Sequence, residues 1–204
     1  MIISVIFVLL FLAFLMGIIL VPKIDGKINM IKVAVMGIMA IFCYQSFWAF
    51  MFQLVGIPVN LKSTCISMAA AVLLLWGMII KKKKMQRIFV RITDIAVLAV
   101  LAGIVIAVSL HMFTPYLRLS YINSDPANHF NDAMVIVKQG VLGKHIYFSA
   151  FVNAMFIEIF SPILIVSKYY KAFIFADIFM HVLEVWMCYV LMLSLIHISE
   201  PTRP

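Results

Sequence analysis

Long apolar runs separated by short polar segments dominate the hydrophobic pattern of this chain. Each run is long enough to cross a hydrocarbon core of ~30 Å as an α-helix, which rises about 1.5 Å per residue. This pattern predicts an all-α, polytopic transmembrane helix bundle of about six spans. The predicted spans cover residues 2–21, 33–55, 61–80, 92–113, 147–166 and 172–192.

Composition favours lipid over water as the environment of this bundle. Of the 204 residues, 66% are hydrophobic and only 12% are charged, whereas a soluble domain carries about 25% charged residues. The net charge is +8, but the basic residues occupy short segments between apolar runs, where they orient membrane proteins. No soluble face interleaves basic with aromatic residues, as a nucleic-acid interface would. We therefore expect membrane lipid as a partner and no nucleic acid.

The last residues of the chain resemble a sequence of different origin. Leu193 to Arg203 read Leu-Ser-Leu-Ile-His-Ile-Ser-Glu-Pro-Thr-Arg. This run resembles the translation of a transposon-end adapter used in sequencing libraries, and scars of this kind do not belong to a fold. We therefore assign residues 1–192 to the membrane domain and residues 193–204 to a non-native tail. The natural protein is expected to continue beyond about Met192.

The distribution of lysine and arginine between alternate loops predicts the orientation of the spans. One set of loops carries few basic residues, namely Lys62, Arg118, Lys138 and Lys144. The other set carries Lys23, Lys27, Lys32, Lys81, Lys82, Lys83, Lys84, Arg87, Arg91, Lys168 and Lys171. The richer set should be cytoplasmic in a multi-pass protein of the plasma membrane. The amino terminus and the loop 114–146 are then expected outside.

The outer loop 114–146 is the one long polar segment, and it predicts a short amphipathic helix. Asp125 can cap the free amide groups of a helix start, and Pro126 suits the first helical position. Gly140 suits the stop. An apolar stripe at helical spacing consists of Phe130, Ala133, Met134 and Val137. We expect this helix to lie in the membrane interface with its stripe toward the acyl chains.

Asp125, His129 and Asp132 share one face of this helix at spacing i, i+4, i+7. A carboxylate beside an imidazole can take a proton from a hydroxyl group or hold a divalent metal. These three residues are therefore candidate catalytic residues, with a divalent metal as a conceivable cofactor. A helix cap followed by a solvated polar face is the structural alternative.

The run Ser-Asp-Pro-Ala-Asn-His-Phe at residues 124–130, followed by Ala133 and by Gln139-Gly140, resembles the GT-C-type glycosyltransferases that use polyprenyl phosphates. The resemblance covers roughly residues 110–165. It implies a multi-pass membrane enzyme of cell-envelope polysaccharide or glycolipid synthesis, with a polyprenyl-phosphate sugar donor. In that family an acidic residue of the first large outer loop is the catalytic base, and the matching position is Asp125.

Basic residues of the same loop fit an anionic donor. Arg118, Lys138, Lys144 and His145 could stabilise a lipid phosphate as it leaves. The alternative is that these side chains extend to the phosphates of ordinary membrane lipids.

A second set of polar residues lies inside the predicted spans. Asp177, His181 and Glu184 repeat the spacing i, i+4, i+7 in the sixth span, and Glu158 of the fifth span could face them. Ionisable groups at such depth normally face the bundle interior and often mark a pathway. Asp94, near the cytoplasmic end of the fourth span, is expected to be shallow, pairing with Arg91 or extending to solvent.

Three functions therefore remain as hypotheses. The leading one is a GT-C-like glycosyltransferase with Asp125 as base. The second is a secondary transporter or channel subunit that uses the intramembrane cluster as a proton or cation path. The third is a noncatalytic membrane scaffold. The chain contains no Gly-rich phosphate loop, nucleophile elbow or His-Glu-x-x-His motif.

Overall fold

Helices form wherever the apolar runs are uninterrupted, because a helix satisfies its own backbone hydrogen bonds in an apolar environment. The computed structural model describes residues 2–21, 27–81, 87–113, 125–142, 148–160 and 168–199. Its helices are α1 (Ile2–Leu20), α2 (Met30–Leu54), α3 (Leu61–Lys81), α4 (Ile92–Phe113), α5 (Asp125–Gln139), α6 (Phe148–Phe160) and α7 (Lys168–Ser199). The predicted all-α class is confirmed.

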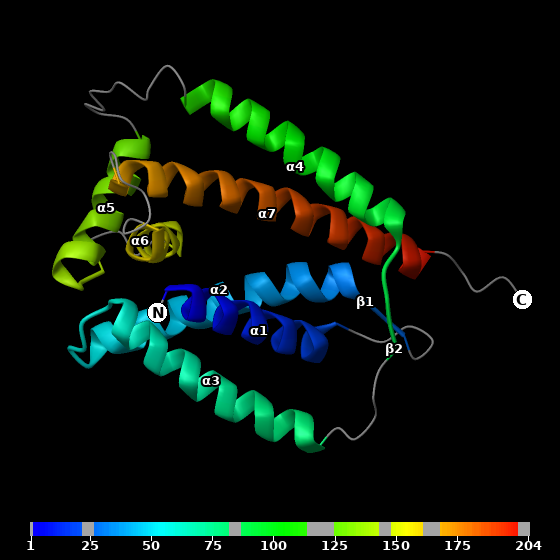
Figure 1. Ribbon diagram of the computed structural model, residues 1–204, viewed down its shortest axis with the longest axis horizontal. Helices are drawn as coiled ribbons and strands as arrows, with labels where there is room; N and C mark the ends of the chain where they lie inside the picture. Colours follow the sequence, from blue (N-terminus) through cyan, green and yellow to red (C-terminus); the bar gives the residue numbers. More distant parts are fainter. Residues whose placement is uncertain are drawn as a thin grey trace, which may run out of the picture.

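Most of the helices extend along the long axis of the molecule, and the others gather at one end (Figure 1). The long helices are α1, α2, α3, α4 and α7, whereas α5 and α6 lie together beside the start of α7. We call this the α5 end. The opposite end, here the strand end, holds two short strands that the sequence did not predict, β1 (Lys27–Asn29) and β2 (Arg87–Phe89). They pair in parallel, with Ile28 opposite Ile88.

Within the described ranges, four helices are long and apolar enough to cross a membrane, and they coincide with four predicted spans. These candidate spans are Met30–Leu54, Leu61–Met78, Ile92–Met112 and Tyr169–Leu195. Helix α1 fills the first predicted span, with Val5–Leu20 as its apolar part. The protein thus has the helices of a membrane protein.

The predicted fifth span, residues 147–166, is not confirmed. Its described part is α6, which has 13 residues and so extends only ~20 Å along its axis. Figure 1 shows α6 nearly end-on while the long helices run across the view, so α6 lies crosswise at the α5 end. Residue 147 and residues 161–166 lie outside the described part of the chain.

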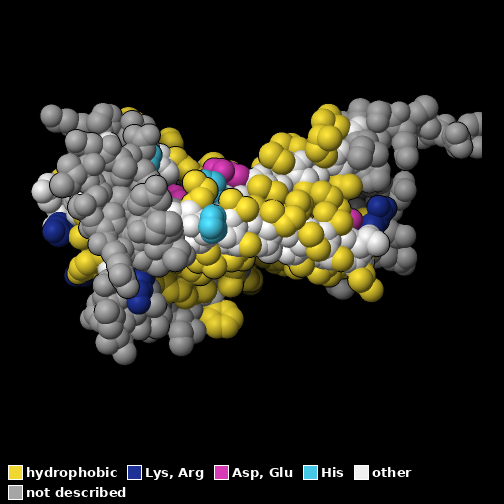
Figure 2. Space-filling model, turned by 90° about the horizontal axis from the view of Figure 1, so that it is seen from above, with side chains coloured by type: hydrophobic (Ala, Val, Ile, Leu, Met, Phe, Trp, Pro, Cys, Tyr) yellow, Lys and Arg dark blue, Asp and Glu magenta, His cyan; other side chains and the backbone are white. Residues whose placement is uncertain are grey.

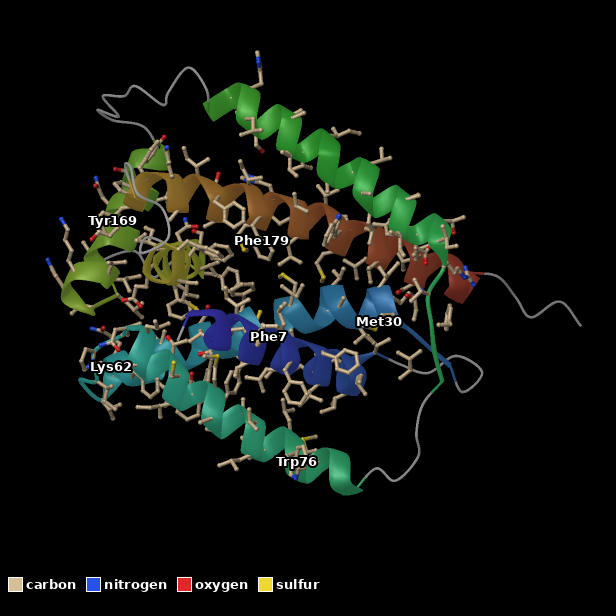
Figure 3. All side chains as sticks on the ribbon, viewed as in Figure 1. Phe7, Met30, Lys62, Trp76, Tyr169 and Phe179 are labelled. Atoms are coloured by element: carbon tan, nitrogen blue, oxygen red, sulfur yellow. The ribbon has the colours of Figure 1, made fainter. Side chains whose placement is uncertain are left out.

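The start of α7 lies at the α5 end, which changes the predicted map of the loops. The ring of Tyr170 lies 5.7 Å from the ring of Phe130 on α5. Figure 3 likewise shows Tyr169 and Lys62 at this end, and Met30 at the strand end. The sequence placed Lys168 and Lys171 opposite the loop 114–146. That prediction is wrong. Helix α6 lies crosswise at the α5 end instead of running along the bundle, and α7 therefore begins at the same end as α5.

Glycines bring α1 and α2 into close contact. A Cβ atom added to Gly37 would collide with the carbonyl group of Ala13, and one added to Gly17 would collide with the carbonyl group of Val33. Small residues of this kind let helix backbones approach closely in membranes, where packing rather than water exclusion drives association. The α1–α2 pair therefore depends on the absence of side chains at these two positions.

The strand end is fastened by a buried carboxylate. Asp94 at the start of α4 is only 4% exposed. It accepts hydrogen bonds from the amide of Asn29 at 3.2 Å and from the hydroxyl of Tyr189 on α7 at 3.0 Å. The charge of nearby Lys32 acts on it as well. Asp94 thus links α2, α4 and α7, whereas the sequence predicted a shallow side chain that pairs with Arg91 or reaches solvent.

Replacing Gly37 with alanine should destabilise the bundle by at least about 1–3 kcal/mol, because the added methyl group meets backbone that cannot yield. The midpoint of unfolding in detergent micelles measures the loss. Gly103→Ala on α4 is the matched control, since a Cβ atom there meets nothing within 4 Å. Equal effects of the two substitutions would contradict the close α1–α2 contact.

Candidate functional site

Helix α5 has the boundaries that the sequence predicts. It runs from Asp125 to Gln139, and Gly140 ends it with φ of +67°, a left-handed conformation that favours glycine. The predicted apolar stripe exists, but it faces protein. Ala133 is fully buried and Ile136 nearly so in a cluster that includes α6 and α7. The expectation that the stripe faces acyl chains is therefore wrong.

Aromatic contacts fix α5 on the start of α7. The ring of Phe130 lies 5.4 Å from that of Phe173 at an interplanar angle of 72°, and it makes a similar edge contact with Tyr170. Edge-to-face pairs of this kind add about 0.5–1.5 kcal/mol to the free energy gained by burial. Phe130 therefore anchors the helix that carries the candidate catalytic residues.

The turn after α5 is held by the connection between α2 and α3. The backbone N–H of Val59 donates to the carbonyl of Gly140 at 2.7 Å, and the N–H of Leu142 donates to the side chain of Gln53 at 3.1 Å. A Cβ atom at Gly140 would lie 2.9 Å from Pro58. Glycine is thus required at Gly140 both for its conformation and for this close approach.

This docking brings His129 of α5 close enough to Asp177 of α7 for their charges to interact. The imidazole of His181 also lies near this carboxylate, with Nδ1 at 3.7 Å from Oδ2 of Asp177. The same Nδ1 lies 2.8 Å from the backbone carbonyl of Asp177. The sequence assigned the two polar sets to rival functions, and the structure joins them around Asp177.

The group formed by His129, Asp177 and His181 remains accessible. The side chains of His181 and Asp177 are 53% and 30% exposed, and Glu184, whose charge also acts on Asp177, is exposed. Figure 2 shows acidic and histidine side chains together in a hollow, with apolar side chains on either side. A carboxylate near imidazole groups can take part in proton transfer.

Glu158 does not join this group. Its carboxylate accepts a hydrogen bond from the backbone N–H of Leu61, at the start of α3. Asn60 accepts hydrogen bonds from the N–H groups of Lys62 and Ser63 at the same helix end. Carboxylates stabilise the positive end of a helix dipole. The prediction that Glu158 faces Asp177 is therefore replaced by a role at the amino terminus of α3.

The remaining predicted site residues are only partly described. Asp132 is half-buried on α5, and Lys138 is exposed near its end. Asp125 begins α5, but its side chain lies outside the described residues, as do Arg118, Lys144 and His145. Among the side chains that the structure describes, no group of three His, Cys, Asp or Glu residues could hold a metal ion. Because the side chain of Asp125 lies outside this set, the divalent metal stays a prediction.

Sequence reasoning missed a buried polar group inside the bundle. Gln45 on α2 and Asn153 on α6 are 1% and 2% exposed. The hydroxyl of Ser67 on α3 donates to Gln45, and the hydroxyl of Tyr44 donates to the backbone carbonyl of Ser67 at 3.0 Å. Uncharged polar residues within apolar runs were the available signal, since such groups commonly bond across helices in membranes.

Comparisons with protein-family models, with curated proteins and with solved structures find no match to this chain.

The electrostatic interaction between His129 and Asp177 should couple α5 energetically to α7. We expect a double-mutant cycle with His129→Ala and Asp177→Asn to give an interaction energy of about 0.5–3 kcal/mol, as for residues that share a polar network. Unfolding in micelles supplies the four free energies. His129→Ala combined with Asp94→Asn is the control pair, because Asp94 lies at the strand end. Additive effects for His129 and Asp177 would show that the two side chains do not interact.

Proposed function

We propose that this protein is a GT-C-like membrane glycosyltransferase that takes a sugar from a lipid-phosphate donor and serves cell-envelope polysaccharide or glycolipid synthesis. One observation carries the proposal. Helix α5, which begins at Asp125, is packed onto α7 so that the charges of His129 and Asp177 interact in the part of the apolar bundle nearest the α5 end. Asp177 lies eight residues inside the candidate span of α7, about 12 Å along the helix from the end where a lipid would present its phosphate.

The proposed topology has α1, α2, α3, α4 and α7 crossing the membrane, with α5 and α6 at its outer face. The unequal charge of the two ends supports this orientation. Among the described residues, the strand end carries Lys27, Lys32, Lys81, Arg87 and Arg91, and the α5 end carries Lys62, Lys138, Lys168 and Lys171. The α5 end has fewer. The amino terminus then lies outside, as the sequence predicted.

In the proposed reaction Asp125 acts as the base. It takes the proton of an acceptor hydroxyl as that oxygen bonds to the anomeric carbon of the sugar. The bond from this carbon to the donor phosphate oxygen breaks, and the lipid phosphate leaves with the electron pair. Lys138 and the other basic residues of the loop stabilise the leaving phosphate.

His129 and Asp177 support this base in the proposal. Asp125 and His129 are one helical turn apart, about 6 Å along the α5 axis, so both residues lie on the same face of the helix. Asp177 lies close enough to His129 for the two charges to interact, and it can orient this side chain. His129 could then donate a hydrogen bond to the Asp125 carboxylate and orient it toward the acceptor hydroxyl.

Asp125→Asn should lower sugar transfer from a polyprenyl-phosphate donor by about 10²–10⁴-fold, the usual contribution of a general base. Asp177→Asn should lower it less, because that residue acts through His129. Both variants are assayed in native membranes, with Asn128→Ala as a control on the exposed side of α5. Full activity of Asp125→Asn, at normal abundance of the protein, would remove this residue from the mechanism.

A further inference from the structure

One row of exposed side chains follows α7 beyond the candidate site. His181, Glu184, Cys188 and Leu191 are all exposed, and they succeed one another at intervals of three, four and three residues. Residues at this spacing form a single stripe along a helix, as in the seam of a helix pair. In the most apolar stretch of α7 only 11% of the residues are buried inside the protein, compared with 39% in the corresponding stretch of α2. The stripe therefore has no cover from the described bundle.

Lipid is a poor cover for this stripe. His181 and Glu184 both lie within the candidate span Tyr169–Leu195. An ionisable side chain costs at least about 2.5–3.5 kcal/mol near the centre of a bilayer, and such residues therefore face protein or water. The row needs a partner that supplies both a proton donor and a proton acceptor at this depth.

The geometry of His181 leaves it ready for such a partner. Its Nδ1 is directed to Asp177, toward the start of the helix, and therefore away from Glu184. Within the described chain, Glu184 has no hydrogen bond and no ion pair. When an imidazole and a carboxyl group share one proton, the pair carries no net charge. Contact between them therefore avoids the free-energy cost of burying a charge.

We propose that this stripe is covered by α7 of a second copy of the same chain. The stripe is self-complementary in charge, so a two-fold axis pairs His181 of each copy with Glu184 of the other. Two copies inserted in one membrane direction place their α7 helices in parallel, and the three–four spacing suits such a pair. The polar residues fix the register, while Cys188 and Leu191 pack along the same seam.

This inference stands on α7 alone and does not depend on the proposed reaction. Cys188 lies in the predicted seam, which provides a direct test. In a parallel pair two seam cysteines approach within the Cα separation of about 4.4–6.8 Å that a disulfide requires. The variant Cys43→Ser/Cys65→Ser keeps Cys188, and the variant Cys65→Ser/Cys188→Ser keeps the equally exposed Cys43 on α2.

With mild oxidation in native membranes, the Cys188 variant should form a covalent dimer at least about tenfold faster than the Cys43 variant, because only its thiols are held at bonding distance. Adding Glu184→His should abolish this advantage by placing two imidazoles together. Adding His181→Glu as well should restore it by reversing the pair.

Two outcomes would overturn the proposal. Equal cross-linking of the Cys188 and Cys43 variants would show only random collision. Fast labelling of Cys188 by a membrane-impermeant maleimide, without dimer formation, would show that the stripe lines a water-filled path. Neither readout uses sugar transfer, so failure here is distinct from failure of the proposed function.

Discussion

The apolar contact of α5 with α6 and α7 determines how α5 lies against the rest of the bundle. Ala133 and Ile136 are buried in this contact, and Phe130 closes it against Phe173. The burial of this one stripe sets the rotation of α5 and brings His129 close enough to Asp177 for their charges to interact. It also keeps the start of α7 beside α5, so that the chain enters its last long helix from this end. Both the proposed site and the proposed topology follow from that contact.

The two ends of the bundle are held by different physical means. At the strand end, a buried carboxylate on α4 interacts with an amide of β1, a lysine of α2 and a hydroxyl of α7. In low dielectric such a group is stable only when fully bonded, so Asp94 restricts how these helices can be arranged. Between the ends, the glycines of α1 and α2 permit close backbone packing. The structure thus combines specific polar contacts with apolar surfaces that would otherwise associate in many ways.

Local features of the fold could be predicted from sequence, whereas its connections could not. Uninterrupted apolar runs and the Asp125–Gly140 signals predicted the long helices and the limits of α5. The run 147–166 misled the prediction, because hydropathy does not distinguish a spanning helix from α6, which is buried crosswise among other helices. The wrong side for Lys168 and Lys171 followed from that error. The charge interaction between His129 and Asp177 could not be predicted, since the two residues are 48 positions apart in the sequence.

The side of the membrane on which α7 begins provides the most direct test of the proposed topology. In a variant with Cys43, Cys65 and Cys188 replaced by serine, single cysteines are introduced at Asn131, Lys171 or Arg87. A membrane-impermeant maleimide is applied to sealed cells and to inverted vesicles. If α7 begins beside α5, we expect positions 131 and 171 to react from one side of the membrane and position 87 from the other. Reaction of positions 171 and 87 from the same side would contradict it and restore a spanning α6.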